Sequence, residues 1–237
     1  MVNQQLPKIS IVIPTFNECT NLPKLLSAIF SLPENLTVLV VDDNSPDGTG
    51  QLADNLTKKY PRLFVLQRAG KLGLGSAYRA GFAYALAQGA EVVGEMDADR
   101  SHNPNDLPKL IAAVNAGADV VIGSRRVPGG KIIGWGLWRH IMSWGAMFLA
   151  RLVLQLKTYD VTSGFRLYTK NALGSIPWAK VKSDGYAWQE EILYLCERAG
   201  FKVVEVPVVF EDRKLGKSKL GLKQVEEFFG TLIRLFV

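Results

Sequence analysis

The stretch Glu95-Met96-Asp97-Ala98-Asp99-Arg100-Ser101-His102 decides the fold that we expect, and it follows the short apolar run Val92-Val93. Such a run is typical of a buried strand, so Asp97 and Asp99 come where that strand leaves its sheet. Residues i and i+2 of an extended segment point the same way, which places the two carboxylates side by side. They would repel each other unless a cation lay between them. All-oxygen ligands suit Mg²⁺ or Mn²⁺, so the pair is a candidate metal site; the plainer interpretation is that both aspartates cap the next helix.

Strand and helix patterns alternate around this stretch, from residue 9 to residue 123. The strands are continuous apolar runs, which indicates a mainly parallel sheet covered by helices on both faces. The expected strands are Ile9–Pro14, Val38–Val41, Leu63–Leu66, Val92–Val93, Asp119–Gly123 and Val203–Phe210. The expected helices are 21–31, 49–60, 77–88, 103–117, 186–198 and 225–237.

Three polar clusters follow the ends of expected strands, at Thr15–Glu18, Asp42–Asp47 and Asp97–His102. In an open sheet of this kind, ligands bind outside the carboxyl ends of the strands. We therefore expect these three carboxylate-bearing loops to converge on one edge of the sheet and to form the site.

Composition and charge limit the class of partner. The chain has 237 residues, 48% of them hydrophobic and 21% charged, which is ordinary for a globular protein with a full core. Its two cysteines, Cys19 and Cys196, lie far apart and in no metal-binding spacing, so free thiols are expected. The net charge of +6 favours an anionic partner, which is a nucleic acid, a phosphorylated substrate or a membrane surface.

The segment Ile132–Lys157 is long, apolar and aromatic, and Trp144 and Phe148 recur at helical spacing. One interpretation is a pair of core helices. The other is an amphipathic segment at a lipid interface, where Trp and Arg are favoured. No run of about 18 uncharged apolar residues occurs, so no transmembrane helix is expected.

Several chemistries are disfavoured by missing motifs. A dinucleotide site needs G-x-G-x-x-G directly after the first strand, whereas Gly73 and Gly75 follow the third strand and position 78 is Tyr. Neither a phosphate-binding P-loop nor a G-x-S-x-G nucleophile motif is present. His102 and His140 are the only histidines, which excludes a His-rich metal site.

A nucleic-acid binder stays open as an alternative because of Arg125-Arg126 and the basic run 213–219. Such a protein has no need of acidic loops at three strand ends. The remaining site type combines a divalent cation, a phosphate-rich ligand and several Arg and Lys side chains. This is the layout for transfer from a nucleotide-linked donor, in which the metal neutralises a diphosphate leaving group.

Seven segments together resemble the family 2 inverting glycosyltransferases, and more narrowly the dolichyl- or polyprenyl-phosphate mannosyltransferases. They cover nearly the whole chain, and their combination is highly specific. They are Pro14-Thr15-Phe16-Asn17-Glu18, 41–49 (VDDNSPDGT), 73–78 (GLGSAY), 96–104 (MDADRSHNP), Gly123-Ser124-Arg125, Thr162-Ser163-Gly164-Phe165-Arg166 and 212–220 (DRKLGKSKL).

The resemblance implies one catalytic domain over residues 1–237, with the α/β nucleotide-diphospho-sugar transferase fold called GT-A. Residues 9–124 would be the nucleotide-sugar-binding half. Residues 125–237 would bind the acceptor, with amphipathic interfacial segments at 132–157 and 222–237. The implied reaction is inverting transfer of mannose from GDP-mannose to dolichyl or polyprenyl phosphate, giving lipid-phosphate mannose and GDP. The alternatives are a polyprenyl-phosphate glucosyltransferase that uses UDP-glucose, and a basic non-catalytic nucleotide- or nucleic-acid-binding protein.

The resemblance also assigns roles to individual residues. Catalysis would rest on Asp97, Asp99 and Arg213. The metal, Mg²⁺ or Mn²⁺, would be held by Asp97, Asp99 and Ser101. The nucleotide sugar would contact Pro14, Phe16, Glu18, Val41, Asp43, Lys71, Asp97, Ala98, Asp99, Arg213 and Lys219. The acceptor phosphate would contact Ser124, Arg125 and Arg139. The implied partners are a membrane surface on its cytoplasmic side, bound peripherally, and small membrane-anchoring subunits, with no nucleic acid.

Overall fold

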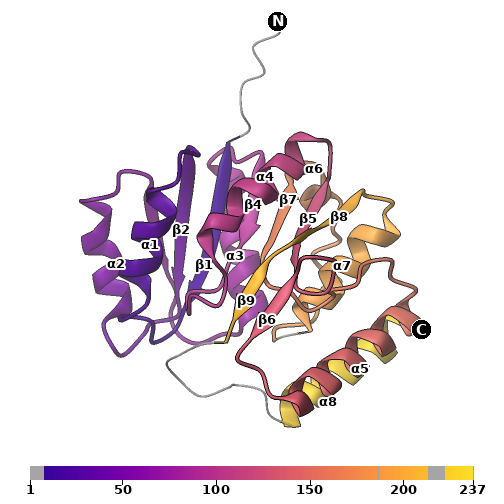
Figure 1. The fold of residues 1–237 in the computed structure, drawn as a ribbon. Helices are drawn as coiled ribbons and strands as arrows, with labels where there is room; N and C mark the ends of the chain where they lie inside the picture. Colours follow the sequence, from indigo (N-terminus) through magenta and orange to yellow (C-terminus); the bar gives the residue numbers. More distant parts are fainter. Residues whose placement is uncertain (1–7, 186, 213–221, 237) are drawn as a thin grey trace, which may run out of the picture.

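The structure is a computed structural model that describes residues 8–185, 187–212 and 222–236. Its centre is a seven-stranded sheet with the strand order β3-β2-β1-β4-β7-β5-β8 (Figure 1). The strands are β1 Ile9–Thr15, β2 Leu36–Asp42, β3 Leu63–Gln67, β4 Val92–Glu95, β5 Val120–Ser124, β7 Arg166–Thr169 and β8 Val203–Pro207. All neighbours pair in parallel except β7, which runs antiparallel between β4 and β5. The predicted mixed α/β fold with a mainly parallel sheet is therefore confirmed.

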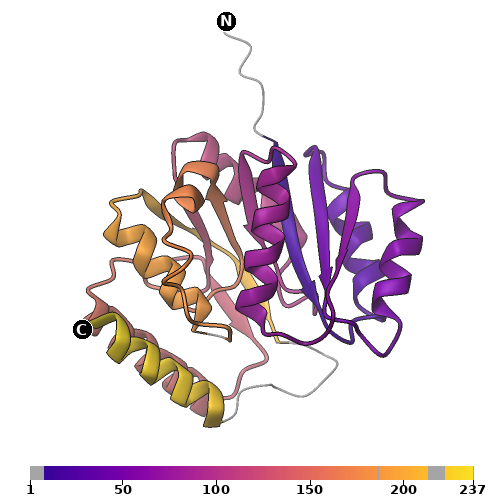
Figure 2. The same cartoon turned by 180° about the vertical axis from the view of Figure 1, so that it is seen from behind.

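Helices cover both faces of this sheet, as Figures 1 and 2 show from opposite sides. Successive residues of a strand point to opposite faces. Ile11 of β1 accordingly packs against one group of helices and Val12 against the other. The first group is α1 Leu22–Phe30, α2 Thr49–Thr57 and α4 Leu107–Asn115, which follows the short 3-10 turn η1 Pro104–Asp106. The second group is α3 Leu74–Ala87, α5 Leu137–Leu154, α6 Lys170–Ser175, α7 Trp188–Arg198 and α8 Leu222–Phe236.

The segment Val203–Phe210 was predicted as one strand, and this was wrong. It forms β8, which ends at Pro207, and the separate strand β9 Val209–Glu211. Proline cannot donate to a strand ladder, which favours the break at this point. β9 pairs in parallel with β6 Lys131–Ile133 in a second, two-stranded sheet. β9 also lies beside the loop that follows β4. Phe210 of β9 forms an isolated β-bridge with His102 of that loop.

Helices α5 and α8 lie side by side at one flank of the molecule (Figures 1 and 2). Met147, Ala150 and Leu154 of α5 are buried in the core, so the core interpretation holds for this part of the segment. Other apolar side chains of α5 are exposed, among them Trp138 and Trp144, which are 72% and 63% exposed. The exposed large apolar residues of the two helices are Leu137, Trp138, Ile141, Met142, Trp144, Phe148, Leu152, Phe229, Ile233 and Phe236.

Helix α8 packs on the protein through Leu232, which is buried in the core, and through polar side chains beside it. The Glu227 carboxylate accepts a hydrogen bond from the Gly185 amide at 2.8 Å. Arg234 donates to both oxygens of Glu191, at 2.7 and 2.9 Å. We name the exposed apolar residues of α5 and α8 the apolar flank. Among the described residues, no helix has the length and apolar character needed to cross a membrane.

Candidate active site

The loops after β1 and β2 converge at the carboxyl edge of the sheet and are braced against each other. The Thr15 hydroxyl donates to Asp42 Oδ1 at 2.8 Å. The Asn17 amide donates to the hydroxyl of Ser45 at 3.1 Å. The Glu18 amide donates to the hydroxyl of Thr49 at 2.9 Å. The structure therefore confirms the predicted convergence for these two of the three loops.

Two aspartates to which the sequence assigned no role of their own organise these loops. Asp42 is buried and accepts hydrogen bonds from the amide and the hydroxyl of Ser45, at 2.9 and 2.6 Å. Asp47 accepts from the amides of Cys19 and Thr49, at 3.1 and 3.0 Å. Although its slight burial opposes the effect, these hydrogen bonds lower the pKa of Asp47 below its ordinary value. In the sequence, only the dense run of turn residues from Asp42 to Thr49 indicated that side-chain hydrogen bonds would hold these loops.

The predicted nucleotide-binding residues differ in how far a ligand can reach them. Lys71 lies over the ring of Phe16, with its Nζ 4.5 Å from the ring centre. Asp43 pairs with Arg68 at 2.7 Å, and its burial raises its pKa although Arg68 opposes the shift. The side chain of Val41 is fully buried in the core, so a ligand there would meet its backbone. Pro14 and Glu18, which belong to the same predicted set, are half-buried.

The loop after β4 presents the predicted metal ligands. Asp97 has a partly exposed carboxylate, and Asp99 accepts a hydrogen bond from the Ser101 amide at 3.0 Å. Arg100, which lies between Asp99 and Ser101, has a φ of 66°, and this conformation closes the turn tightly. Ser101 is buried, and within the described ranges its hydroxyl has no hydrogen-bond partner. The fourth predicted site residue of this loop, Ala98, is buried.

The oxygen ligands of this loop fit a divalent ion that also takes oxygen ligands from a bound phosphate. In the part of the chain that the structure describes, no group of three or more His, Cys, Asp and Glu side chains could hold a metal. An ion at Asp97 and Asp99 would therefore need further oxygen ligands from a bound molecule. Mg²⁺ is commonly held in this way, by one or two carboxylates together with substrate phosphates.

Two residues from other elements reach the same point as Asp97, and the sequence assigned neither to it. A Cβ on Gly164 would lie 3.5 Å from Gln189 Nε2 and 3.6 Å from Asp97 Oδ2. Gln189 is in the first turn of α7 and is buried, with an Oε1 that has no partner among the described groups. No spacing along the chain indicates this contact, because it depends on β7 bringing the 162–165 loop beside β4.

A buried charged cluster lies directly beneath the loop. Glu95, the last residue of β4, is fully buried and accepts a hydrogen bond from Trp188 Nε1 at 2.8 Å. Burial raises its pKa to about 7, although the nearby guanidinium of Arg166 opposes the shift. Arg166 is itself fully buried and donates to the carbonyl oxygens of Ser163, Gln189 and Val161 at 2.7, 2.7 and 2.8 Å.

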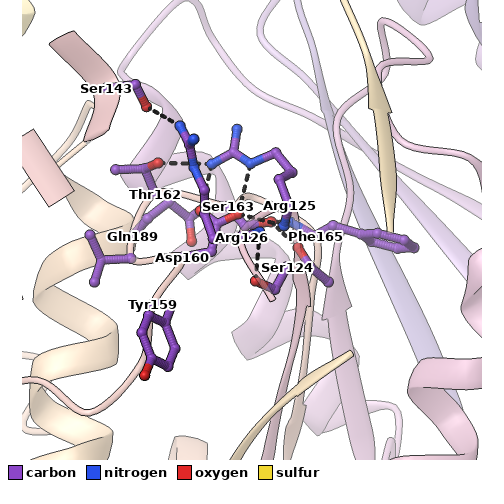
Figure 3. A network of polar contacts seen from close by, with 12 residues as sticks. Ser124, Arg125, Arg126, Ser143, Tyr159, Asp160, Thr162, Ser163, Phe165 and Gln189 are labelled. Atoms are coloured by element: carbon purple, nitrogen blue, oxygen red, sulfur yellow. Dashed lines mark hydrogen bonds and ion pairs between the residues drawn. The ribbon is translucent and has the colours of Figure 1, made fainter. Parts of the chain in front are cut away.

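Two of the predicted acceptor-binding residues, Ser124 and Arg125, belong to a second network, which is drawn in Figure 3. Arg125 is buried and donates to both carboxylate oxygens of Asp160, at 2.7 and 2.6 Å, and to the hydroxyl of Thr162 at 2.8 Å (Figure 3). Ser124 is fully buried, and its hydroxyl accepts from the Arg126 amide at 3.2 Å. The guanidinium of Arg125 is thus held in place by the protein itself.

Arg139 lies nearer to solvent than Arg125. Its guanidinium lies 4.2 Å from the centre of the Trp135 ring and pairs with Asp212 at 2.8 Å. It joins the start of α5 to the residue that follows β9. The predicted roles of Arg213 and Lys219 lie outside the described residues.

Comparisons with known proteins agree on one family. The sequence model described as "Glycosyl transferase family 2" matches residues 10–176. The chain is 44% identical to an undecaprenyl-phosphate mannosyltransferase from Micrococcus luteus, over 90% of this chain and 88% of that protein. It is also 44% identical to a polyprenol monophosphomannose synthase from Mycolicibacterium smegmatis, over 92% of this chain and 82% of that protein.

Solved structures share the fold at lower sequence identity. The glucosyl-3-phosphoglycerate synthase of Mycobacterium tuberculosis, in complex with Mn²⁺, UDP and glucosyl-3-phosphoglycerate, has a TM-score of 0.68 at 19% identity, over 97% of this chain and 80% of that chain. A mannosyltransferase from Pyrobaculum calidifontis, in complex with GDP-Man and Mn²⁺, has a TM-score of 0.61 at 17% identity, over 98% of this chain and 65% of that chain. The fold is the GT-A fold that the sequence predicted.

Proposed function

The chain belongs to glycosyltransferase family 2, and from that premise we propose that it transfers mannose from GDP-mannose to a polyprenyl phosphate. One observation carries the proposal: Asp97 and Asp99 stand at the carboxyl edge of the sheet beside two braced loops that suit a nucleotide. The acceptor class and the sugar are supported by the two relatives at 44% identity, which are named for mannose transfer to undecaprenyl phosphate and polyprenol phosphate.

The residues at this edge fit a divalent ion, Mg²⁺ or Mn²⁺, held by Asp97 and Asp99. When bound, the ion supplies positive charge that stabilises the leaving nucleoside diphosphate. Ser101 is a third candidate because its buried hydroxyl has no protein partner among the described residues. The predicted nucleotide contacts Phe16 and Lys71 lie in the loops after β1 and β3, and Lys71 supplies a further positive charge for phosphates.

The acceptor needs no general base in this proposal. A phosphate monoester has a second pKa near 6, so its oxygen is already largely ionised at pH 7. Attack on the anomeric carbon from the side opposite the diphosphate inverts the configuration. The protein contributes positioning and charge stabilisation. We assign first contact with the acceptor phosphate to Arg139, because its side chain is partly exposed, whereas that of Arg125 is buried in its pair with Asp160.

A donor and acceptor comparison tests this function. We expect mannose from GDP-mannose to appear on polyprenyl phosphate in the presence of Mg²⁺ or Mn²⁺, and removal of the ion with a chelator to abolish the product. UDP-glucose with the same acceptor is the matched control and should give little transfer. Transfer from UDP-glucose in preference to GDP-mannose would replace the proposed donor, and failure with every lipid phosphate would contradict the acceptor.

We also propose that the apolar flank binds the membrane that carries the acceptor. A polyprenyl phosphate stays in the bilayer with only its head group in water, so the site has to come to that surface. Trp and Phe side chains suit a membrane interface, and hydrogen bonds of Glu227 and Arg234 hold α8 on the protein with Phe229, Ile233 and Phe236 exposed. Arg151 and Lys157, at the far end of α5, would each add about 1 kcal/mol near an anionic surface.

Vesicle co-sedimentation tests the apolar flank. The wild-type protein should sediment with phosphatidylcholine vesicles containing phosphatidylglycerol, and high salt should weaken this only in part, because the burial of apolar side chains is insensitive to screening. The double variant Trp138→Glu/Trp144→Glu should bind about tenfold more weakly or worse.

The control for this experiment is Gln51→Glu/Gln88→Glu, which adds the same charge at exposed positions away from the apolar flank. It should sediment as the wild type does. If vesicle binding is weakened equally in the two double variants, added charge alone explains the loss. A folded wild-type protein that never sediments with vesicles would contradict the membrane proposal while leaving the transferase proposal intact.

A further inference from the structure

Arg126 carries a charge that no ion pair balances within the described ranges. Its neighbour Arg125 takes both carboxylate oxygens of Asp160, at 2.7 and 2.6 Å (Figure 3). Arg126 instead donates to the hydroxyl of Ser143 in α5 at 2.9 Å, and this partner is neutral. Two adjacent guanidinium groups thus face one carboxylate, so the network in Figure 3 keeps an excess of positive charge.

The surroundings of Arg126 make this excess charge costly. The side chain is half-buried, and its Nε is buried with no hydrogen-bond partner among the described residues. Burial lowers the pKa of Arg126, Asp160 opposes the shift, and the neighbouring charge of Arg125 adds to it. An anion bound beside the guanidinium would offset both the burial and the repulsion.

Arg126 also lies next to the residue that we assign to the acceptor phosphate. Its partner Ser143 follows Arg139 by four residues in α5, and residues four apart are neighbours on one face of a helix. The guanidinium groups of Arg125 and Arg139 both lie against the ring of Trp135, 5.8 and 4.2 Å from its centre. Three arginine side chains therefore gather around the first two turns of α5.

The charge of the acceptor changes during the proposed reaction. A phosphate monoester has a second pKa near 6, so it carries about two negative charges at pH 8. Transfer of a sugar to this phosphate gives a diester, which has only one ionisable oxygen and one negative charge. A site with one more positive charge than the diester needs would therefore hold the acceptor more tightly than the product.

We propose that Arg126 is a specificity-determining residue that binds the acceptor phosphate together with Arg139 and selects its dianionic form. This inference rests on the proposed function. Arg139 shares its charge with Asp212, at 2.8 Å, whereas Arg126 brings a charge that no carboxylate takes up in the described part of the chain. Guanidinium groups suit phosphate because their donors form a fixed planar fork. Loss of one charge on mannose transfer then weakens the hold on the product and favours its release.

The test measures how strongly each variant prefers a dianionic ligand. The probes are geranyl phosphate, a short monoester, and its methyl ester, which has the same chain and one negative charge. Their dissociation constants are measured by isothermal titration calorimetry at pH 8, without donor. Arg126→Gln removes the charge and keeps a donor for Ser143, whereas Arg126→Lys keeps the charge.

We expect the wild type to bind geranyl phosphate more tightly than the methyl ester. Arg126→Gln should bind geranyl phosphate about 10- to 100-fold more weakly, because a hydrogen bond between charged groups is lost, and should bind the methyl ester with a smaller change. Arg126→Lys should keep most of the preference.

Arg79→Gln is the matched control. Arg79 is also half-buried, also has a buried Nε without a partner among the described residues, and donates to one oxygen, that of Val181, at 2.9 Å. It belongs to α3 and has no place in the network of Figure 3. This variant should bind both probes as the wild type does.

Two results would overturn the role of Arg126. The first is an unchanged affinity of Arg126→Gln for geranyl phosphate. The second is equal weakening for both probes, because loss of a structural support does not depend on the charge of the ligand. If Arg126→Gln does not fold, as judged by its melting temperature, Arg126→Met takes its place with the same expectations. A folded wild-type protein that binds neither probe would contradict the proposed acceptor as well, which distinguishes the two failures.

Discussion

Asp99→Asn is expected to lower the rate of sugar transfer by about 10²- to 10³-fold while leaving the fold intact. The substitution keeps an oxygen that can accept the Ser101 amide, so the turn after β4 survives. It removes one of the two negative charges that would hold a divalent ion beside the leaving diphosphate. Loss of one group that stabilises developing charge commonly has an effect of this size.

Asp119→Asn is the matched control for this prediction. Asp119 is also half-buried and also accepts a backbone hydrogen bond, from the Lys202 amide at 2.9 Å, but it precedes β5 at the opposite edge of the sheet. The rate of sugar transfer by Asp119→Asn should stay close to that of the wild type. Initial rates at saturating metal and donor decide the matter, with melting temperatures as the check on folding. Near-normal turnover by Asp99→Asn would remove Asp99 from the metal site.

Much of the nucleotide side of the molecule could be predicted from the sequence, because the signals there are local. The apolar runs of β1, β2 and β4 are each followed at once by polar turn residues, and parallel strands bring such turns to one edge. The loops after β1 and β2 meet for that reason. The position of Asp97 directly after β4 could likewise be predicted from the local sequence.

The other half of the site depends on contacts between residues far apart in the sequence. β7 has only four residues and was missed, yet it places Gly164 and Arg166 beside β4. Arg125 has the pattern of a surface base, and nothing in the local sequence indicates that Asp160 will bury and hold it. His102 was weighed as one of too few histidines for a metal cluster, and its place beside Asp97 depends on packing against Phe165, which precedes β7, and Phe210 of β9.

Arg166→Met is expected to destabilise the protein by about 3–5 kcal/mol, the largest loss of stability that we predict. The Arg166 guanidinium is fully buried and makes three hydrogen bonds of 2.7 to 2.8 Å to carbonyl oxygens. Methionine has a similar length and would fill much of the volume. It would leave those carbonyls unpaired and would leave the Glu95 carboxylate without its opposing cation.

The pH dependence of this loss follows from Glu95. In the folded wild-type protein its pKa is about 7, above the ordinary value of 4.5, so ionisation of Glu95 disfavours the fold. Its contribution to stability therefore falls as the pH rises from about 4.5 to 7, and then levels off. Without Arg166 the folded pKa rises further, and the contribution keeps falling above pH 7. The difference in unfolding free energy between Arg166→Met and the wild type should be larger at pH 8 than at pH 6.

Urea unfolding at pH 6 and pH 8 measures both effects. Arg198→Met makes the same substitution at an exposed arginine of α7, where the stability should change by no more than about 0.5 kcal/mol at either pH. A loss in Arg166→Met that is large but equal at the two pH values would show that the unpaired carbonyls dominate and that Arg166 does not stabilise the charged form of Glu95. A loss of stability no larger than that of Arg198→Met would contradict the stabilising role of the Arg166 hydrogen bonds. Three buried carbonyl oxygens cannot lose their donor without effect unless water replaces it.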